Sequence, residues 1–244
     1  MKLIEATDLT FEYRVIRTTS TSFKEVVRDV MRGSVKISPI RALNRVSFSL
    51  DSGEILGIVG GNGAGKSTLL KILAGVLPPL SGSIKVTGNV APMIALGAGF
   101  HPEMTGNENT IFYSALVGRD LKTVKSQLTE IGEWAGTLDH MDYPMRSFSS
   151  GMVARLAFSA ATHERADILL IDEVLSVGDA KFRNATRDRI ASQVSEGSSV
   201  VLVSHEEKTI REMCNKVIWL EGGNIRMIGK TEEVMNAYKQ DQGL

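Results

Sequence analysis

The sequence predicts an α/β protein built around a mainly parallel sheet. Its 244 residues, 43% of them hydrophobic and 23% charged, are enough for one compact domain or two tightly joined lobes. Predicted strands alternate with predicted helices along much of the chain. Several of these strands are continuous apolar runs, which is typical of strands that helices cover on both faces of a sheet.

The composition excludes several kinds of protein. Formal net charge is zero and the isoelectric point is near 6.9, so no overall positive charge indicates a nucleic-acid partner. The single cysteine, Cys214, excludes an internal disulfide and suits a reducing compartment. The N-terminus has no apolar segment of signal-peptide length, and no run of about 18 apolar residues occurs, so we expect no membrane-spanning helix.

The first third of the chain is predicted to be rich in strands and to contain one short helix. Residues 3–13 and 41–60 read as strand-rich, because apolar residues alternate or form a continuous run there. A helix is expected over 66–74, ended by a glycine with two prolines beyond it. Residues 82–94 read as a pair of strands with a Gly-Asn turn at 88–89, which is typical of a hairpin.

Helices and strands alternate in the rest of the chain. Residues 104–140 are predicted to be mostly helical. We then expect helix, strand, helix, strand and helix in turn, at 151–163, 166–173, 180–195, 198–205 and 206–214. The C-terminal region, about 216–240, reads as a hairpin closed by a helix over 231–239.

A glycine-rich segment between a buried strand and a helix indicates a phosphate-binding loop. Its sequence fits G-x-x-x-x-G-K-[ST], with Gly60, Gly65, Lys66 and Ser67 at the fixed positions. Glycine lets the backbone approach a phosphate closely, and the helix start adds N–H donors and the positive end of the helix dipole. The alternative is a glycine-rich turn without a ligand, and the strand and helix on either side argue against it.

The residues of this loop have separate expected parts in holding ATP. Lys66 is expected to reach the β- and γ-phosphates, Ser67 to coordinate Mg²⁺, and Thr68 to bond the α-phosphate. ATP and Mg²⁺ are therefore the predicted cofactors. The nucleotide-binding residues predicted in the loop are Gly60, Asn62, Gly63, Ala64, Gly65, Lys66, Ser67 and Thr68.

Two predicted strands end in side chains suited to phosphoryl chemistry. Asp172 and Glu173 follow four apolar residues, at the strand end where ligands bind in a parallel sheet. Asp172 is predicted to hold Mg²⁺ together with Ser67, and Glu173 to act as general base toward the attacking water. His205 ends a second strand on the same expected edge, within reach of the γ-phosphate. Each group taken alone is also consistent with an ordinary polar strand end.

Residues 148–152, Phe-Ser-Ser-Gly-Met, resemble the signature motif of ABC-transporter ATPases, whose usual form is Leu-Ser-Gly-Gly-Gln. Arg155 matches the basic residue that follows it. The phosphate loop, the signature, "ILLIDE", "SVGD" and "VSH" occur in the family's order, and the match covers nearly the whole chain. Together with "SSGM", the segments "LSVGDAKF" and "LGAGFHPEMTGNEN" resemble the branch that exports polysaccharides.

The resemblance implies a P-loop NTPase fold over 1–244. It would have a RecA-like core, an N-terminal antiparallel β subdomain and an α-helical signature subdomain at about 100–162. Some members of the branch carry a further carbohydrate-binding domain, and the sequence leaves open whether one follows here.

The resemblance also implies an ATP site that two chains complete. Two copies would pack head to tail, so that Ser149, Ser150 and Gly151 of one chain close on the γ-phosphate held by the other. The N-terminus of the helix at 151–163 would supply N–H donors for that contact. Asp179, in "SVGD", resembles the residue that crosses the dimer interface. Tyr13 best matches the aromatic residue that stacks on adenine. A plain helix cap is an equally valid description of Ser149.

Two departures from the family pattern are visible. The usual glutamine that contacts Mg²⁺ is missing, and Ala95 and Leu96 stand where it would fall. His101 and Glu103 are weak candidates to replace it, and the other interpretation places them on the surface that meets a membrane subunit.

The second departure is an insertion of about 27 residues, 14–40, after Tyr13. It contains a predicted amphipathic helix at 22–33, with seven Lys or Arg residues against two acidic ones over 14–41. This helix either packs on its own domain or turns its basic face to anionic lipid or a membrane partner.

These features predict the ATP-hydrolysing subunit of an exporter of lipid-linked polysaccharide, of the O-antigen, teichoic acid, galactan or capsule type. Its expected partners are an integral membrane permease, a second copy of itself and, through the permease, the polysaccharide. It would act at the cytoplasmic face of the inner (plasma) membrane, held there by the permease. The alternatives are an ATPase of another ABC transporter class and a soluble ABC ATPase without a transport role.

Overall fold

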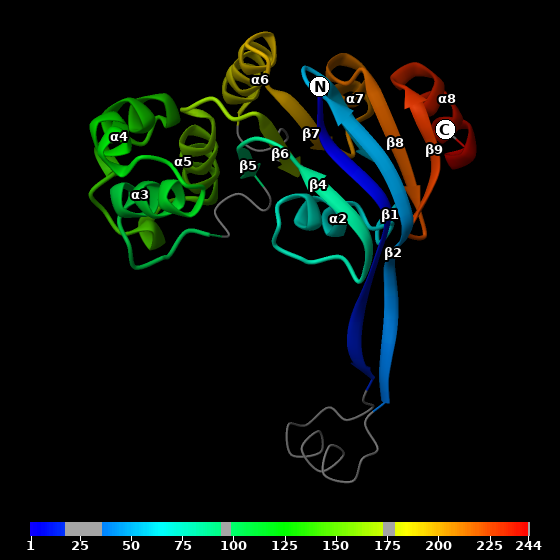
Figure 1. The fold of residues 1–244 in the computed structure, drawn as a ribbon. Coiled ribbons are helices and arrows are strands. Elements are labelled where there is room, and N and C mark those ends of the chain that lie inside the picture. Colours follow the sequence, from blue (N-terminus) through cyan, green and yellow to red (C-terminus); the bar gives the residue numbers. More distant parts are fainter. Residues whose placement is uncertain (18–35, 94–98, 173–178, 244) are drawn as a thin grey trace.

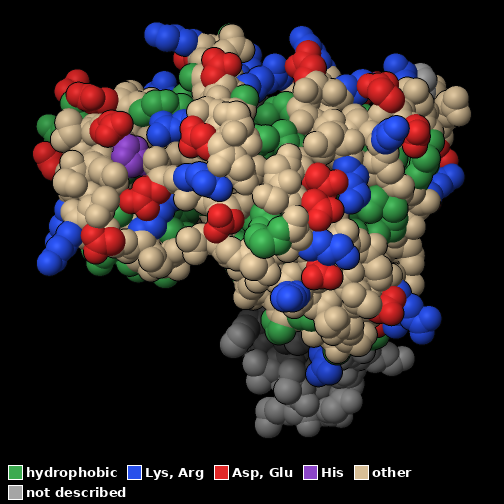
Figure 2. Space-filling model, turned by 45° about the horizontal axis from the view of Figure 1, so that its top comes forward, with side chains coloured by type: hydrophobic (Ala, Val, Ile, Leu, Met, Phe, Trp, Pro, Cys, Tyr) green, Lys and Arg blue, Asp and Glu red, His purple; other side chains and the backbone are tan. Residues whose placement is uncertain are grey.

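The computed structural model describes residues 1–17, 36–93, 99–172 and 179–243 (Figure 1). A six-stranded sheet and a three-stranded sheet lie together, and three helices form a separate group at one side. The predicted α/β class with a mainly parallel sheet, an antiparallel sheet and a helical group is confirmed. No helix within the described ranges has the length and apolar character needed to cross a bilayer. On the face drawn in Figure 2, acidic and basic side chains are interspersed.

The larger sheet has the strand order β5-β6-β7-β3-β8-β9. Neighbours from β5 to β8 are parallel, and only β8 and β9 pair antiparallel. The central strands β3 and β7 are almost wholly buried, as their continuous apolar runs require. The strands are β3 (Ile55–Val59), β5 (Val90–Met93), β6 (Ile168–Asp172), β7 (Ser199–Val203), β8 (Lys216–Glu221) and β9 (Asn224–Lys230).

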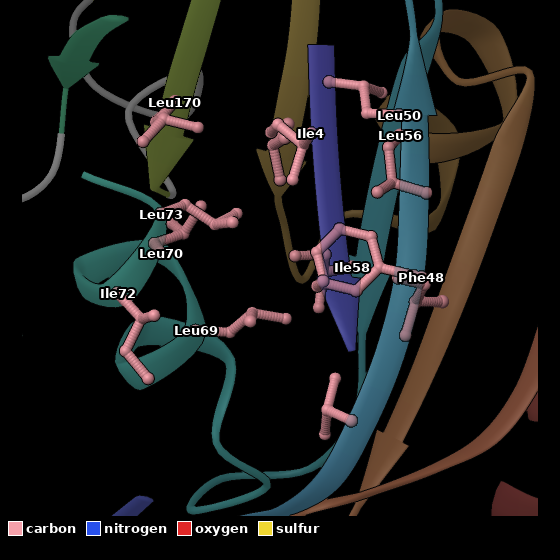
Figure 3. Packing of buried hydrophobic residues seen from close by; sticks show 14 of the residues in the cluster. Ile4, Phe48, Leu50, Leu56, Ile58, Leu69, Leu70, Ile72, Leu73 and Leu170 are labelled. Atoms are coloured by element: carbon pink, nitrogen blue, oxygen red, sulfur yellow. The ribbon is translucent and has the colours of Figure 1, made fainter. Parts of the chain in front are cut away.

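The smaller sheet is antiparallel and has the order β2-β1-β4. Its strands are β1 (Lys2–Arg17), β2 (Lys36–Asp51) and β4 (Ser81–Val86). Helix α2 (Lys66–Leu73) packs with both sheets. In Figure 3, Leu69, Leu70 and Leu73 of this helix belong to one buried cluster with Ile4 and Leu170. This packing fixes the start of α2 relative to the parallel sheet.

The predicted hairpin at 82–94 is wrong. Both strands exist, but β4 pairs with β1 and β5 pairs with β6, so the turn between them links two different sheets. The turn is fixed to β6 by Asp167, whose Oδ2 accepts a 2.8 Å hydrogen bond from the Asn89 N–H. Gly88 has φ +100°, and a Cβ there would come within 2.7 Å of Asp167. Tertiary partners at two sheet edges therefore replaced the local pairing.

Three helices form a second body with its own hydrophobic cluster. They are α3 (Gly106–Leu116), α4 (Leu121–Ala135) and α5 (Ser150–Thr162), with 3₁₀ turns at Leu138–His140 and Met145–Ser147. Buried side chains of this cluster include Ile131, Met145, Phe148 and Leu156. The remaining helices are α6 (Ala180–Ser195), α7 (Glu207–Met213) and α8 (Thr231–Gln242).

The first two strands are longer than predicted. Their pairing continues from Tyr13 opposite Ile40 to Arg17 opposite Lys36, so both ends of the predicted 14–40 insertion are strand. This part of β1 and β2 is a two-stranded ribbon that projects from the rest of the described chain (Figure 1). The predicted amphipathic helix at 22–33 lies outside the described residues.

Candidate functional site

The glycine-rich loop joins the end of β3 to the start of α2, as predicted. Gly60, Gly63 and Gly65 have φ values of +148°, +76° and +106°, in the region that residues with a Cβ avoid. A Cβ on Gly60 would lie 2.1 Å from the Leu220 carbonyl oxygen, and one on Gly65 would lie 2.4 Å from that of Ala42. The loop thus needs glycine both for its backbone angles and for its close packing.

Lys66 lies at the centre of this loop. Its side chain is buried, and Nζ donates to the carbonyl oxygens of Gly60 at 2.7 Å and Gly61 at 3.0 Å. The N-cap of α2 is Gly65, which has no side chain to accept a hydrogen bond from the N–H groups of the first turn. A buried ammonium beside a helix start suits a polyphosphate.

A pocket of about 330 Å³ opens beside the loop. Tyr13 and His205, far apart in the sequence, both line it together with the loop residues from Asn62 to Thr68. The Tyr13 hydroxyl lies 3.2 Å from the Thr68 hydroxyl, and one of the two donates to the other. The structure therefore brings the predicted adenine-side and phosphate-side residues together.

Three further residues, Ile40, Arg41 and Ala42, line the same pocket and were missed by the sequence analysis. Ile40 lies opposite Tyr13 in the β1–β2 ribbon, and Arg41 binds Glu12 through Nε at 2.9 Å. Their place in the pocket depends on the pairing of β1 with β2, two strands that the insertion separates in the sequence.

Sheet register brings Asp172 and His205 to the same edge. Asp172 ends β6 and lies opposite Val203 of β7, which in turn lies opposite Ile58 of β3. The loop after β3, Asp172 and His205 thus all follow the carboxyl ends of adjacent parallel strands, where α/β proteins bind ligands. Glu173, the predicted general base, lies outside the described residues.

Ser67 and Asp172 fit a magnesium ion in chemistry. Their oxygens are the hard ligands that Mg²⁺ takes, with substrate phosphates and water completing its octahedron. Ser67 lines the pocket, and α2, which carries it, packs against β6, which ends in Asp172. Within the described ranges no group of three or more His, Cys, Asp or Glu side chains could hold a metal without such help.

The signature residues lie elsewhere in the chain. Ser149 caps α5, and its Oγ accepts a 3.2 Å hydrogen bond from the Met152 N–H. Ser149 and Ser150 are exposed, and Gly151 is half-buried. None of the three lines the pocket beside Lys66, and α5 and α2 belong to different parts of the molecule in Figure 1. Both interpretations of Ser149 are compatible with this geometry, because a capping serine at an exposed helix start remains accessible.

Asp179 caps α6, and its Oδ1 accepts a 2.8 Å hydrogen bond from the Phe182 N–H. Asp179 does not line the pocket beside Lys66.

The residues suggested as substitutes for the missing glutamine do not reach the pocket. His101 Nδ1 accepts a 3.3 Å hydrogen bond from the Glu103 N–H, and Glu103 forms an ion pair with Arg146. Neither His101 nor Glu103 lines the pocket, so the hypothesis that they serve as metal ligands there has no support from the geometry. Ala95 and Leu96 lie outside the described residues.

Known structures share this fold. An ATP-binding subunit of an ABC transporter superposes with a TM-score of 0.74 at 21% identity, covering 97% of this chain and 93% of the other. A dimeric ATP-binding cassette in a post-hydrolysis state, bound to ADP and Pi, gives 0.75 at 18% identity, covering 93% of this chain and 98% of the other.

Curated relatives are more similar in sequence. An O-antigen export system ATP-binding protein of Klebsiella pneumoniae is 37% identical over 240 residues, 98% of each chain. A protein of the same name from Myxococcus xanthus is 38% identical over 233 residues, 94% of this chain, which spans about half (53%) of that relative. A teichoic acids export ATP-binding protein of Lactococcus lactis is 39% identical over 199 residues, 82% of this chain and 42% of the relative.

The ABC transporter family model matches residues 43–176, which include the phosphate loop, the signature and Asp172. The match covers more than half of the chain, and the Klebsiella relative is similar along nearly its whole length. The resemblance drawn from the motifs is confirmed: the chain belongs to the ABC transporter family.

Proposed function

We propose that this chain hydrolyses ATP to drive export of a lipid-linked polysaccharide, of O-antigen, teichoic acid or galactan type, through a membrane permease. The support for the substrate class is the set of relatives named for O-antigen and teichoic acid export, one of which aligns over 98% of both chains. The motif "LGAGFHPEMTGNEN" agrees with that branch.

The observation that carries the proposal is the separation of the two halves of one site. Lys66 and the loop that surrounds it lie in a pocket, whereas Ser149 stands exposed at the start of α5 and does not line that pocket. An exposed helix start offers N–H donors and the positive end of a dipole to an anion. A second copy, packed head to tail, would bring its Ser149, Ser150 and Gly151 to the γ-phosphate held here. A cassette of the same fold is dimeric in a post-hydrolysis state bound to ADP and Pi, which supports a two-chain site.

Each residue of the pocket then has a chemical part. Lys66 would leave the Gly60 and Gly61 carbonyls for the β- and γ-phosphates, and Thr68 would exchange the Tyr13 hydroxyl for the α-phosphate. Tyr13 would face the adenine. Ser67 and Asp172 would hold Mg²⁺, which supplies neutralisation of charge on the phosphate oxygens.

Glu173 would accept the proton of the attacking water, and His205 would contact the γ-phosphate. Closure of the dimer on ATP and its reopening after hydrolysis would move the permease, because the nucleotide binds the closed dimer more tightly. The proposed location is the cytoplasmic face of the inner (plasma) membrane, through the permease. An ATPase of another ABC transporter class is the second candidate.

One experiment separates the steps of this proposal. Glu173→Gln removes the base but keeps the phosphate cradle, so we expect ATP to drive a stable dimer, visible by analytical ultracentrifugation, with hydrolysis reduced by about 10²-fold or more. Lys66→Ala is the matched control, and it should lose tight ATP binding and with it the dimer. A dimer that forms equally without nucleotide would contradict the two-chain site.

The transport role needs its own test. Detergent extraction from the native membrane, followed by purification of this chain, should recover a polytopic membrane protein. Recovery of the chain alone, under conditions that keep a known permease complex intact, would favour an ABC ATPase without a transport role.

A further inference from the structure

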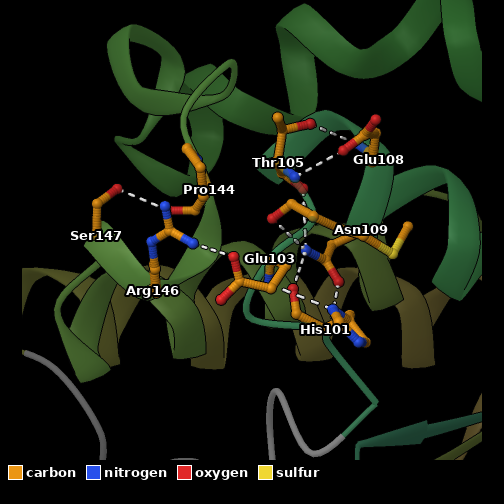
Figure 4. A network of polar contacts seen from close by, with 9 residues as sticks. His101, Glu103, Thr105, Glu108, Asn109, Pro144, Arg146 and Ser147 are labelled. Atoms are coloured by element: carbon orange, nitrogen blue, oxygen red, sulfur yellow. Dashed lines mark hydrogen bonds and ion pairs between the residues drawn. The ribbon is translucent and has the colours of Figure 1, made fainter.

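The side chain of Asn109, in α3, is completely buried and fully engaged with backbone groups of one loop. Its Oδ1 accepts a 2.6 Å hydrogen bond from the His101 N–H. Its Nδ2 lies 3.0 Å from the carbonyl oxygens of His101, Met104 and Thr105, and donates to them. Asn109 therefore holds the loop 101–105 against the first turns of α3 (Figure 4).

That loop is bonded in turn to the segment that leads into the signature. The Met145 N–H donates to the Met104 carbonyl oxygen at 2.9 Å, and the Arg146 N–H donates to that of Pro102 at 2.9 Å. Arg146 also forms an ion pair with Glu103, as Figure 4 shows. Loop 101–105 and segment 144–147 are thus joined by main-chain and side-chain contacts.

The distance along the chain from these contacts to the signature is short. Arg146 is three residues before Ser149. Between them, Phe148 is buried in the cluster of the helical body, and its N–H donates to the Met145 carbonyl oxygen at 3.0 Å. The position of Ser149 is therefore tied to loop 101–105 as well as to α5.

Loop 101–105 also follows, along the chain, a strand of the parallel sheet next to the candidate site. It follows β5, which pairs with β6, the strand that ends in Asp172. The contacts around Asn109 therefore connect the chain after β5 to Ser149, two parts that the pocket itself does not join.

We infer that Asn109 is a positioning residue for the signature: by holding loop 101–105, to which segment 144–147 is bonded, it sets where Ser149 meets the nucleotide held by a second copy. This inference rests on the proposed function and names the residues that make the two-chain site precise. Asn109 touches no nucleotide itself. A purely apolar side chain could fill its buried position, but only an amide offers both the acceptor and the donors that the loop backbone uses.

The test compares binding within one chain with closure between two. In a Glu173→Gln background we would measure the affinity of each variant for a fluorescent ATP analogue, and ATP-driven dimerisation by analytical ultracentrifugation. Asn109→Ala should leave analogue affinity within about twofold, while the dimer dissociation constant rises by roughly tenfold or more, because misplacement by about 1 Å is costly at a site that must close precisely. In the chain with Glu173 intact, kcat should fall more than KM changes.

Asn107→Ala is the matched control, since Asn107 is in the same helix and its Nδ2 donates to Asp142 at 2.8 Å on the surface. It should change dimerisation little. Asn109→Ser, whose hydroxyl keeps one acceptor and one donor, should fall between the wild type and Asn109→Ala. It also decides the question if Asn109→Ala does not fold, as judged by circular dichroism.

Three results would overturn the inference. Dimerisation of the Asn109 variants equal to that of Asn107→Ala would do so. So would an equal loss of analogue affinity and dimerisation, which indicates general unfolding, or an Asn109→Ser variant that dimerises less well than Asn109→Ala. Failure of the Glu173→Gln protein itself to dimerise with ATP would instead contradict the proposed function, so the two failures are distinguishable.

Discussion

Gly65→Ala should destabilise the fold much more than Gly63→Ala, although both glycines belong to the phosphate loop. Gly65 has φ +106° and Gly63 has φ +76°, so alanine is strained at both positions. The surroundings differ: a Cβ on Gly65 would lie 2.4 Å from the Ala42 carbonyl oxygen and 2.9 Å from Leu43 Cδ2, whereas a Cβ on Gly63 would meet nothing within 4 Å. Comparison of the two variants therefore isolates the collision with β2.

The magnitudes follow from these two terms. Left-handed backbone angles cost an L-residue about 1–2 kcal/mol, and that term applies to both variants. The collision at Gly65 involves the β2 backbone, which cannot turn aside as a side chain can, and forced packing of this kind costs about 1–3 kcal/mol more. We expect a loss in the free energy of unfolding of about 2–5 kcal/mol for Gly65→Ala and about 1–2 kcal/mol for Gly63→Ala.

Urea unfolding without nucleotide is the suitable assay, because it separates folding from ligand binding. The transition midpoint should shift while its slope stays the same, so that the shift reports stability alone. Equal losses for the two variants would refute the reasoning, since they would mean that β2 does not constrain the loop.

Three further predictions concern buried ionisable groups. Arg119→Met should lower the free energy of unfolding by about 2 kcal/mol, because the guanidinium donates to the Ala160 and Ala161 carbonyl oxygens at the end of α5. Arg165→Met, at an exposed arginine, is the control. Equal effects of the two substitutions in urea unfolding would contradict the prediction. Burial lowers the pKa of His163, so below about pH 6.5 the unfolded chain takes up a proton that the folded chain resists, and stability should fall as the pH falls. His163→Gln should flatten that dependence in urea titrations from pH 7 to 5, and an unchanged slope would rule the histidine out. Burial raises the pKa of Cys214 to about 12. Iodoacetamide at pH 8 should therefore label this thiol slowly in the folded protein and quickly in urea. Fast labelling of the folded chain would argue against the burial.

Several elements could be predicted from the sequence because their signals are local. The helix expected at 151–163 is observed at Ser150–Thr162, and the one expected at 180–195 is observed at Ala180–Ser195. In both, a capping side chain, Ser149 or Asp179, bonds an N–H three residues later, so the start is encoded within one turn. The strand ending in Asp172 is likewise marked by its own apolar run.

Strand pairing was less predictable, because the choice of partner is not local. The Gly-Asn turn at 88–89 suits a hairpin, yet β4 pairs with β1 at the edge of one sheet and β5 pairs with β6 at the edge of the other. The extension of β1 and β2 across 14–17 and 36–40 depends on register between segments that are separated by the insertion. No periodicity in either segment alone specifies that register.

The sequence by itself determined the phosphate loop, the order of the family motifs and the side chains that β6 and β7 deliver to the sheet edge. These depend on neighbouring residues: glycines that permit positive φ, caps that start helices, and apolar runs that bury strands. Only the tertiary structure decided that Ile40, Arg41 and Ala42 complete the pocket and that Tyr13 meets Thr68. It also decided that Asn109 holds loop 101–105, which is bonded to the segment before Ser149. Those contacts join residues that are separated in the sequence. They form because the packing of the two sheets and the helical body brings these segments together, and no local sequence pattern encodes that packing.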